Sequence, residues 1–281
     1  LEDTLAKPAR VRRIIISELE TVRKKYGQPR KTEILYGHEV EEYREEEQVE
    51  DYPVTLFLSR EGYFKKITPQ SLRMSGEQKY KEGDGPMQQI ETTNAAELMF
   101  FTDRCQVYKA RCADFDDGKA SLLGDYLPTK LGFDEGESVA AVCLPGDYSG
   151  SMLFLFANGK AARVELSAYQ TKSNRRKLTG AYSDKSPLVT ILPLREDQEL
   201  ALLSSEPRAL IFHTSQLAPK ATRTTQGVAV MTLKPKYHLQ RAVPVEQSGI
   251  VNLTRYRTRG IPAAGALVKP EDQGEEQLSL L

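Results

Sequence analysis

The chain has 281 residues, with 39 basic and 39 acidic side chains and a formal net charge of zero. Its apolar fraction of 40% supports a packed core, and no apolar run approaches the roughly 18 residues that a membrane-spanning helix needs. Three cysteines without metal-ligand spacing favour a reducing cytoplasm and do not indicate structural zinc. The first residues form no signal peptide, and the missing initial Met suggests a fragment of a longer protein.

Residues 1–35 are expected to form one helix and a connector. Apolar side chains recur every three or four positions from Val11 to Tyr26, which places them in one stripe. Pro8 suits the first turn of such a helix, and Gly27 suits its end. Because a lone helix of about 19 residues cannot bury its stripe unaided, we expect it to pack on a partner, as in a coiled coil.

Two acidic segments flank the rest of the chain. Residues 36–52 contain eight acidic side chains and one Arg, with little apolar periodicity, and predict a linker. Residues 269–281 are acidic as well and predict a disordered tail. Between them, residues 53–268 alternate short apolar runs with Gly, Pro and Asn turn signals. We therefore expect one all-β domain over residues 53–268.

This β region contains a repeated pattern of an apolar run, a tight turn and a strand with basic residues. Repeats of this size and content are typical of the radially stacked blades of a propeller. The length of the region predicts about five blades in a closed ring, or six if a degenerate copy lies near its end. The copies are residues 56–66, 99–109 and 153–163, with a weaker one at 201–211. They align on Gly62, Cys105, Gly159 and Pro207, at spacings of 43, 54 and 48 residues.

The zero net charge hides an asymmetry. Residues 53–150 carry a net charge of −4, whereas residues 151–266 carry +10. A basic segment of this size is the electrostatic footprint expected for binding to a polyanion. A basic surface that is only solvated is the alternative. The sequence shows no recognition helix, so binding to a nucleic acid is expected to have little sequence specificity.

Several basic residues occupy places that suit phosphate contacts. The densest group spans residues 172–177, after the third hairpin, and residues 254–259 alternate Arg with other residues, which on a strand would place three Arg on one face. Cations around a curved rim can contact phosphates without reading bases, and would favour bent DNA. The candidate DNA-binding residues are Lys65, Lys66, Arg73, Lys79, Lys81, Lys109, Arg111, Lys160, Arg163, Lys172, Arg175, Arg176, Lys177, Lys220, Arg223, Arg255, Arg257 and Arg259.

Catalytic chemistry has no clear signature in the sequence. No Gly-rich phosphate loop is present, and the three His do not form a metal-binding motif. We therefore expect no enzyme activity, no metal and no cofactor in this segment. The rival function of another class is a propeller that binds a protein, with the acidic linker or tail as an arm. A propeller enzyme is a third possibility, disfavoured by the missing acid–base cluster.

The blade sequences resemble a known family. Leu-Phe-Leu-Ser-Arg-Glu-Gly-Tyr-Phe-Lys-Lys-Ile (residues 56–67) and Met-Phe-Phe-Thr-Asp-Arg-Cys-Gln-Val-Tyr-Lys (residues 99–109) are similar to the C-terminal domain of the A subunit of bacterial type IIA topoisomerases, gyrase and topoisomerase IV. Residues 14–34 resemble the end of that family's long coiled-coil arm. The resemblance implies a β-pinwheel, a propeller-like disc whose blades exchange strands, with DNA bent around its outer rim.

One segment departs from the family pattern. Gyrase A carries a Gln-Arg-Arg-Gly-Gly-Lys-Gly box after its first hairpin, and residues 75–85 here read Ser-Gly-Glu-Gln-Lys-Tyr-Lys-Glu-Gly-Asp-Gly. In the family the box is linked to chiral wrapping and negative supercoiling. Its erosion favours topoisomerase IV, which decatenates and relaxes DNA, over gyrase with a degenerate box.

The resemblance also implies partners. It implies double-stranded DNA as the ligand and a homodimeric A-subunit parent that works with a B subunit, with no role for a membrane. The catalytic tyrosine and the ATP and Mg chemistry of the parent would lie outside this chain. The expected location is the cytoplasm, associated with the nucleoid.

Overall fold

The computed structural model describes residues 2–28, 49–74, 76–171 and 176–273. The chain divides into two units, Leu1–Gln48 and Val49–Leu281. The first unit contains α1 (Glu2–Leu5) and α2 (Pro8–Tyr26), which confirms the predicted helix. The apolar stripe of α2 is exposed, with Ile15 and Leu19 exposing 50% and 61% of their surface. In the described residues, no helix is both long and apolar enough to cross a membrane.

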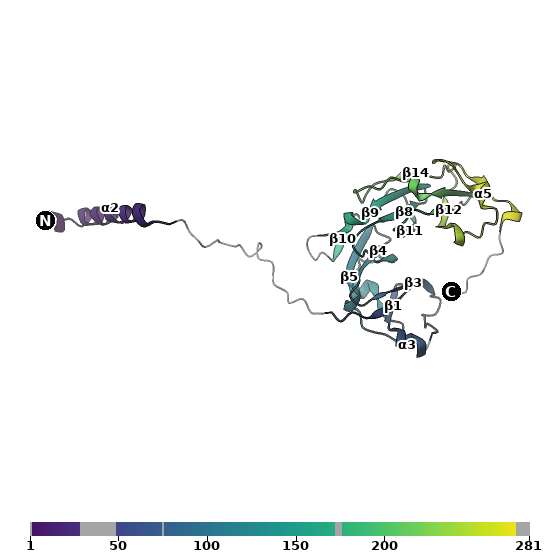
Figure 1. Cartoon of the computed structure of the whole chain (residues 1–281), viewed down its shortest axis with the longest axis horizontal. Helices are drawn as coiled ribbons and strands as arrows, with labels where there is room; N and C mark the ends of the chain where they lie inside the picture. The colour runs from purple at the N-terminus through teal and green to yellow at the C-terminus, as the bar shows by residue number, and fades with distance from the viewer. Residues whose placement is uncertain (1, 29–48, 75, 172–175, 274–281) are drawn as a thin grey trace. The chain divides into compact units, whose positions relative to one another are not determined.

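The second unit contains four antiparallel sheets of four strands within the described residues, and the sheets follow one another along an arc (Figure 1). Each sheet is one blade, built around one of the four hairpins that the sequence predicts. The first blade holds β1 (Pro53–Ser59), β2 (Tyr63–Ile67), β3 (Pro86–Thr93) and β6 (Asp125–Tyr126). The second holds β4 (Glu97–Thr102), β5 (Gln106–Arg111), β7 (Val139–Cys143) and β10 (Lys177–Thr179).

The third and fourth blades repeat this plan. The third holds β8 (Ser151–Phe156), β9 (Lys160–Glu165), β11 (Leu188–Leu194) and β14 (Val228–Ala229), and the fourth holds β12 (Glu199–Ser204), β13 (Arg208–His213), β15 (Leu239–Pro244) and β16 (Ala266–Leu267). Short helical segments connect the strands. They are α3 (Pro69–Met74), α4 (Leu127–Leu131), α5 (Leu253–Tyr256) and the 3₁₀ turns η1 (Cys112–Asp114), η2 (Leu166–Tyr169), η3 (Thr214–Gln216), η4 (Val245–Gln247) and η5 (Pro270–Asp272).

The hairpins follow from their sequences. Three of the four aligned turn residues, Gly62, Cys105 and Gly159, have a positive φ of 86°, 55° and 77°, which reverses the chain tightly. At Gly159 a side chain would also collide with the carbonyl oxygen of Met231. The apolar run before that turn, β8, is buried at every position because both of its faces pack on neighbouring elements.

Neighbouring blades exchange strands in a fixed order. The outer strand of the first blade, β6, follows the hairpin of the second blade in the chain. In the same way, β10 follows the third hairpin and β14 follows the fourth. The strand exchange expected of a β-pinwheel is therefore present. The fourth blade instead takes its outer strand, β16, from the segment that follows its own β15.

Each pair of adjacent blades shares an apolar core. Phe64 of the first blade meets Phe100 of the second edge to face, with ring centroids 5.3 Å apart. Phe101 of the second blade meets Phe154 of the third in the same manner at 5.8 Å. Leucines of β8 and β12 fill the core between the third and fourth blades. Burial of these large side chains is the main force that holds the blades together.

The two ends of the arc are capped separately, and they do not meet in Figure 1. Leu72 and Ala120 cover the outer face of the first blade, and Val245 and Tyr256 cover that of the fourth. No core cluster of the described residues joins the fourth blade to the first. The all-β pinwheel class is confirmed, but the expectation of a closed ring of about five blades is wrong for the described residues. After the fourth hairpin the chain forms a cap instead of another blade.

The predicted flanking segments differ from the structure at their inner ends. Tyr52 donates a hydrogen bond to Asp117 at 2.9 Å, and Asp51 accepts one from the backbone of Ala95 at 3.0 Å, so the last part of the expected linker packs on the domain. Asp272 is buried and accepts a hydrogen bond from Tyr256 at 2.6 Å, so the expected tail begins inside the fold. The greater part of the linker, residues 36–48, and the end of the tail, residues 274–281, lie outside the described residues.

Candidate nucleic-acid interface

Each blade has an inner and an outer edge. The inner strands are β3, β7, β11 and β15, and those of adjacent blades touch. Gln88 of β3 clamps Val142 of β7, because its side-chain amide donates to the Val142 carbonyl at 3.3 Å and accepts from the Val142 N–H at 2.7 Å. The outer strands are β6, β10, β14 and β16, each two or three residues long. We call the segments that lead into them outer connectors: residues 115–124, 170–176, 217–227 and 257–265.

Each outer connector bonds to the second strand of its blade's hairpin, parallel to it on the first, third and fourth blades and antiparallel on the second. In each blade the residue four positions after the aligned turn residue makes a backbone hydrogen bond to the connector. This shared partner marks comparable places along the outer rim, although the second connector accepts the bond and the other three donate it. The bonds join Lys66 to Gly118 (2.7 Å), Lys109 to Arg176 (2.7 Å), Arg163 to Lys220 (2.9 Å) and Ile211 to Thr258 (2.8 Å).

The side chains of Lys66, Lys109 and Arg163 point to the next blade rather than to the rim. Each reaches the turn that leads from its own inner strand into the next hairpin. Lys66 donates to Asn94 at 2.7 Å, Lys109 to Tyr148 at 2.6 Å and Arg163 to Asp197 at 2.8 Å. Lys66 also pairs with Asp117 at 3.2 Å, and its side chain is only 3% exposed. We call these three cations interblade clasps. Lys66 is buried and Lys109 and Arg163 are half-buried, and all three bond inside the fold, which differs from the expectation that they line a DNA-binding surface.

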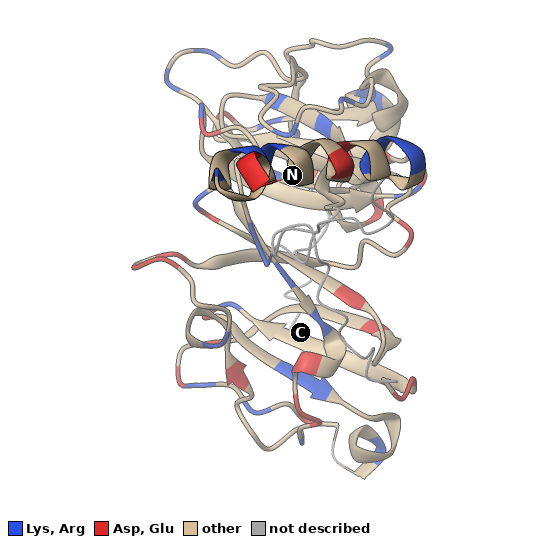
Figure 2. Ribbon diagram, turned by 90° about the vertical axis from the view of Figure 1, so that its left-hand side faces the viewer, with Lys and Arg blue, Asp and Glu red and all other residues tan. Residues whose placement is uncertain are grey.

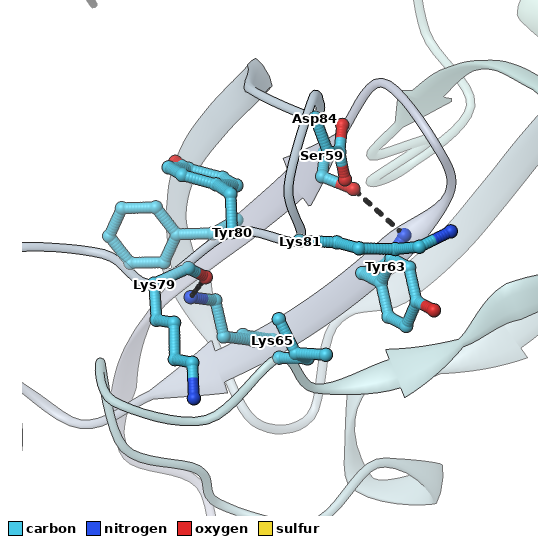
Figure 3. Close-up of a pocket in the computed structure, with 9 residues that line it drawn as sticks. Ser59, Tyr63, Lys65, Lys79, Tyr80, Lys81 and Asp84 are labelled. Carbon is cyan, nitrogen blue, oxygen red and sulfur yellow. Dashed lines mark hydrogen bonds between the residues drawn. The ribbon is translucent and has the colours of Figure 1, made fainter.

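Lys65 is also buried. Its ammonium donates to the carbonyl oxygens of Lys79 (3.0 Å) and Ala120 (3.4 Å) and lies 5.3 Å from the centre of the Tyr80 ring. Burial lowers the pKa of Lys65 from its ordinary value. Figure 3 shows the ammonium beneath the loop that carries Tyr80, while the side chains of Lys79 and Lys81 extend away from it. Lys65 therefore fastens the loop over residues 76–85 to the first blade, and its burial leaves little of it accessible at the rim.

The bonded rim position carries a cation on the second and third blades, and it is Gly118 on the first and Thr258 on the fourth. Arg176 and Lys220 are exposed and have no acidic partner among the described residues. On the fourth blade, Arg257 precedes the connector hydrogen bond and makes a bidentate pair with Glu199 at 2.7 and 2.8 Å. On the first blade the corresponding residue is Asp117, which is 40% exposed. In Figure 2 both signs of charge are spread along the ribbon.

The expected strand over residues 254–259 is wrong. Leu253–Tyr256 form the short helix α5, and the buried Tyr256 ring packs into the cap of the fourth blade. Arg255 and Arg259 remain exposed on either side of the paired Arg257. The three guanidinium groups therefore do not lie on one strand face.

The remaining candidates lie in varied surroundings. Arg73, Lys79, Lys81 and Arg111 are exposed, and Lys81 pairs with Glu61 at 2.8 Å. Lys160 and Arg223 are half-buried, and the Arg223 guanidinium lies 6.0 Å from the centre of the Tyr169 ring. Lys172 and Arg175 lie outside the described residues.

Acidic partners neutralise several of the predicted cations, and the sequence analysis missed them. Asp134 binds Lys177 through both carboxylate oxygens at 2.8 and 2.9 Å. Hydrogen bonds from Gln106 and Lys177 lower the pKa of Asp134, and the bond to Asp134 raises the pKa of Lys177. In the same way, Asp197 forms an ion pair with Arg163, and Glu199 forms one with Arg257. These partners lie 34 to 58 residues from their cations, so no local spacing could have revealed them.

An exchanged-strand arc of antiparallel blades defines the class of the domain, a β-pinwheel, and three solved structures share this fold. The C-terminal domain of DNA topoisomerase IV has a TM-score of 0.67 at 21% identity, covering 78% of this chain and 73% of that one. The Escherichia coli ParC C-terminal domain has a TM-score of 0.59 at 14% identity, covering 79% and 96%. The DNA gyrase A C-terminal domain has a TM-score of 0.52 at 16% identity, covering 79% and 80%.

Sequence comparison points to the same proteins. The chain is 26% identical to the A subunit of DNA gyrase from Streptococcus pneumoniae over 226 residues, which is 76% of this chain and 27% of that protein. It is 23% identical to the A subunit of DNA gyrase from Borrelia hermsii over 255 residues, 88% of this chain and 31% of that protein. The chain thus spans less than a third of these relatives. No protein-family model matches. The resemblance to type IIA topoisomerase A subunits predicted from the sequence is confirmed.

Proposed function

We propose that this chain is a non-catalytic DNA-binding and DNA-bending module from the A subunit of a type IIA topoisomerase. The observation that carries the proposal is the pair of exposed cations, Arg176 and Lys220, at the bonded rim positions of two successive blades, on a fold shared with C-terminal domains of such subunits. Cations on a convex edge attract successive phosphates of one duplex. The additional phosphate interactions offset the cost of bending DNA, about 1–6 kcal/mol for a site of ordinary length.

Rim cations that meet phosphates position a duplex without reading its sequence. Binding should therefore be nearly independent of sequence and steeply dependent on salt. A fluorescence-anisotropy titration of unrelated short duplexes tests both properties. Affinity should fall by orders of magnitude between about 50 and 200 mM salt if six or more phosphates are contacted. Failure to bind any duplex at low salt would overturn the proposal and leave the protein-interaction propeller as the better hypothesis.

The role within the parent enzyme is proposed as guiding a duplex for decatenation and relaxation, as in topoisomerase IV. The eroded box supports this choice, since residues 76–85 mix Lys79 and Lys81 with Glu77, Glu82 and Asp84. The gyrase alternative is supported by the relatives named as gyrase A subunits. Ligation of nicked circular DNA with the protein bound separates the two: an unchanged linking number supports guiding without wrapping, and a clear shift supports chiral wrapping.

The parent enzyme is proposed to be an A-subunit homodimer that works with a B subunit in the cytoplasm, associated with the nucleoid. The catalytic tyrosine, ATP and Mg would belong to other parts of that assembly. Co-purification of the full-length protein with its B subunit, followed by an ATP-dependent decatenation assay, tests this proposal.

A further inference from the structure

The first blade differs from the other three in the charge that it presents at the outer rim. Its outer connector carries Asp116 and Asp117 against one cation, Lys119. The equivalent connectors of the second and third blades carry Arg176 and Lys220 at the bonded rim position and contain no acidic residue. A phosphate that follows the rim would therefore meet opposite charges on the first blade and on the next two.

The strand cations of the first blade cannot compensate for this difference. Lys65 and Lys66 are 4% and 3% exposed, and their ammonium groups are used by Lys79, Ala120 and Asn94. Asp117 pairs with Lys66 at 3.2 Å and accepts a hydrogen bond from Tyr52 at 2.9 Å, and its side chain is 40% exposed. Asp116 is exposed and has no basic partner among the described residues.

The segment over residues 76–85 is held against this blade by its own contacts. The Lys79 N–H donates to the Ala120 carbonyl at 2.9 Å, which ties the segment to the outer connector. Asp84 accepts from the N–H groups of Glu61 and Gly85 at 3.0 and 2.7 Å, and these hydrogen bonds lower its pKa despite its partial burial. Lys81 pairs with Glu61 at 2.8 Å. Residues 76–85, which carry the exposed Lys79 and Lys81, are thus held against the first blade, and the charge of Lys81 is already paired.

We propose that the duplex path runs along the outer connectors of the second, third and fourth blades and leaves out the first, with Arg176 and Lys220 as equivalent phosphate contacts. On the fourth blade the contact falls to Arg255 and Arg259, because Glu199 occupies Arg257. Asp116, which has no basic partner among the described residues, repels the duplex, and the path ends there. This inference rests on the proposed function. It narrows the duplex-binding surface to three of the four blades, with its end at the first blade.

Charge reversal at matched connector positions tests the path. R176E and K220E should each lower the slope of log affinity against log salt by about 0.9, the value for one lost phosphate contact. The matched control is K119E, an exposed lysine on the connector of the first blade, whose slope should stay at the wild-type value. All three side chains are exposed, so the variants should keep the wild-type thermal melt, which circular dichroism checks.

Each outcome of this titration decides the question. A slope loss in K119E as large as that in R176E would overturn the proposal, because the first blade would then lie on the path. Unchanged slopes in both R176E and K220E would overturn it as well. A wild-type domain that binds no duplex would instead remove the proposed function itself. The opposite change, D116K, should raise the slope above the wild-type value, and no rise would overturn the electrostatic reason for the end of the path.

Discussion

Whether a basic side chain is accessible at the rim depends on its burial and its hydrogen-bond partner rather than on its place in the repeat. Lys66, Lys109 and Arg163 occupy the same repeat position and all three reach the turn before the next hairpin. A buried ammonium or guanidinium that has full hydrogen-bond partners specifies one arrangement of its neighbours, and it is costly to leave those partners unsatisfied. On the fourth blade the position is Ile211, fully buried in the cap, and no further blade follows it within residues 176–273.

Replacing Lys66 should therefore destabilise the fold without weakening DNA binding by the folded protein. Lys66→Ala removes the clasp to Asn94 and leaves a cavity, and we expect a loss of about 1–3 kcal/mol in the free energy of unfolding. Urea denaturation measures the loss, and Lys79→Ala, at an exposed side chain, should stay within about 0.5 kcal/mol of wild type. A Lys66→Ala protein with wild-type stability and reduced DNA affinity would contradict the structural role of Lys66 between the blades.

The elements that the sequence predicted well are those fixed by local physics. The helix α2 and the four hairpins follow from apolar spacing and from turn residues such as Gly62 and Gly159, which need few distant contacts. Residues 253–256 show the limit of that reasoning. Alternating Arg residues indicated a strand, but Leu253 and Tyr256, three positions apart, both pack into the cap, and this spacing favours a helical turn. In the described residues this cap stands where a closed ring would place another blade, which no local pattern reveals.

The pair between Glu199 and Arg257 joins β12 to the outer connector and should make stability depend on acidity. The bidentate hydrogen bond from Arg257 lowers the pKa of Glu199 below its ordinary value of 4.5. Its contribution is therefore complete above that ordinary value and is lost as pH falls through the lowered pKa of the folded state. Because the Glu199 side chain is 28% exposed, solvent screening limits the contribution to under about 1 kcal/mol.

Glu199→Gln should accordingly be less stable than wild type at neutral pH, and the difference in the free energy of unfolding should close as pH falls below 4.5 and through the lowered pKa of Glu199. Urea denaturation of both proteins at several pH values measures the gap. Glu61→Gln, which breaks the surface pair with Lys81, is the matched control for a pair outside the cap. A gap that stays constant from neutral to acid pH would show that Glu199 acts by shape and not by charge.

At the scale of the whole domain, charge divides the arc. Residues 53–150 carry −4 and residues 151–266 carry +10, and the bonded rim position changes from Gly118, beside Asp117, to Arg176 between the first and second blades. The charges in the sequence predicted this difference between the two parts of the arc. It could not predict which cations are free, because ion pairs such as Lys177 with Asp134 span blades and long stretches of chain. A duplex near this surface would be attracted mainly to one part of the arc.

Replacing Lys172, Arg175, Arg176 and Lys177 together with Ala should weaken duplex binding more than replacing Lys79 and Lys81 together. The first set removes three cations from a connector without acids and one from the start of β10, whereas Lys81 is already paired with Glu61 and Lys79 lies in a segment with three acids. Lys177 is itself paired with Asp134, so the triple variant that keeps Lys177 should lose nearly as much affinity as the quadruple one. Anisotropy titrations at one low salt concentration compare the three proteins, and equal losses from the two segments would mean that the duplex engages the whole arc evenly.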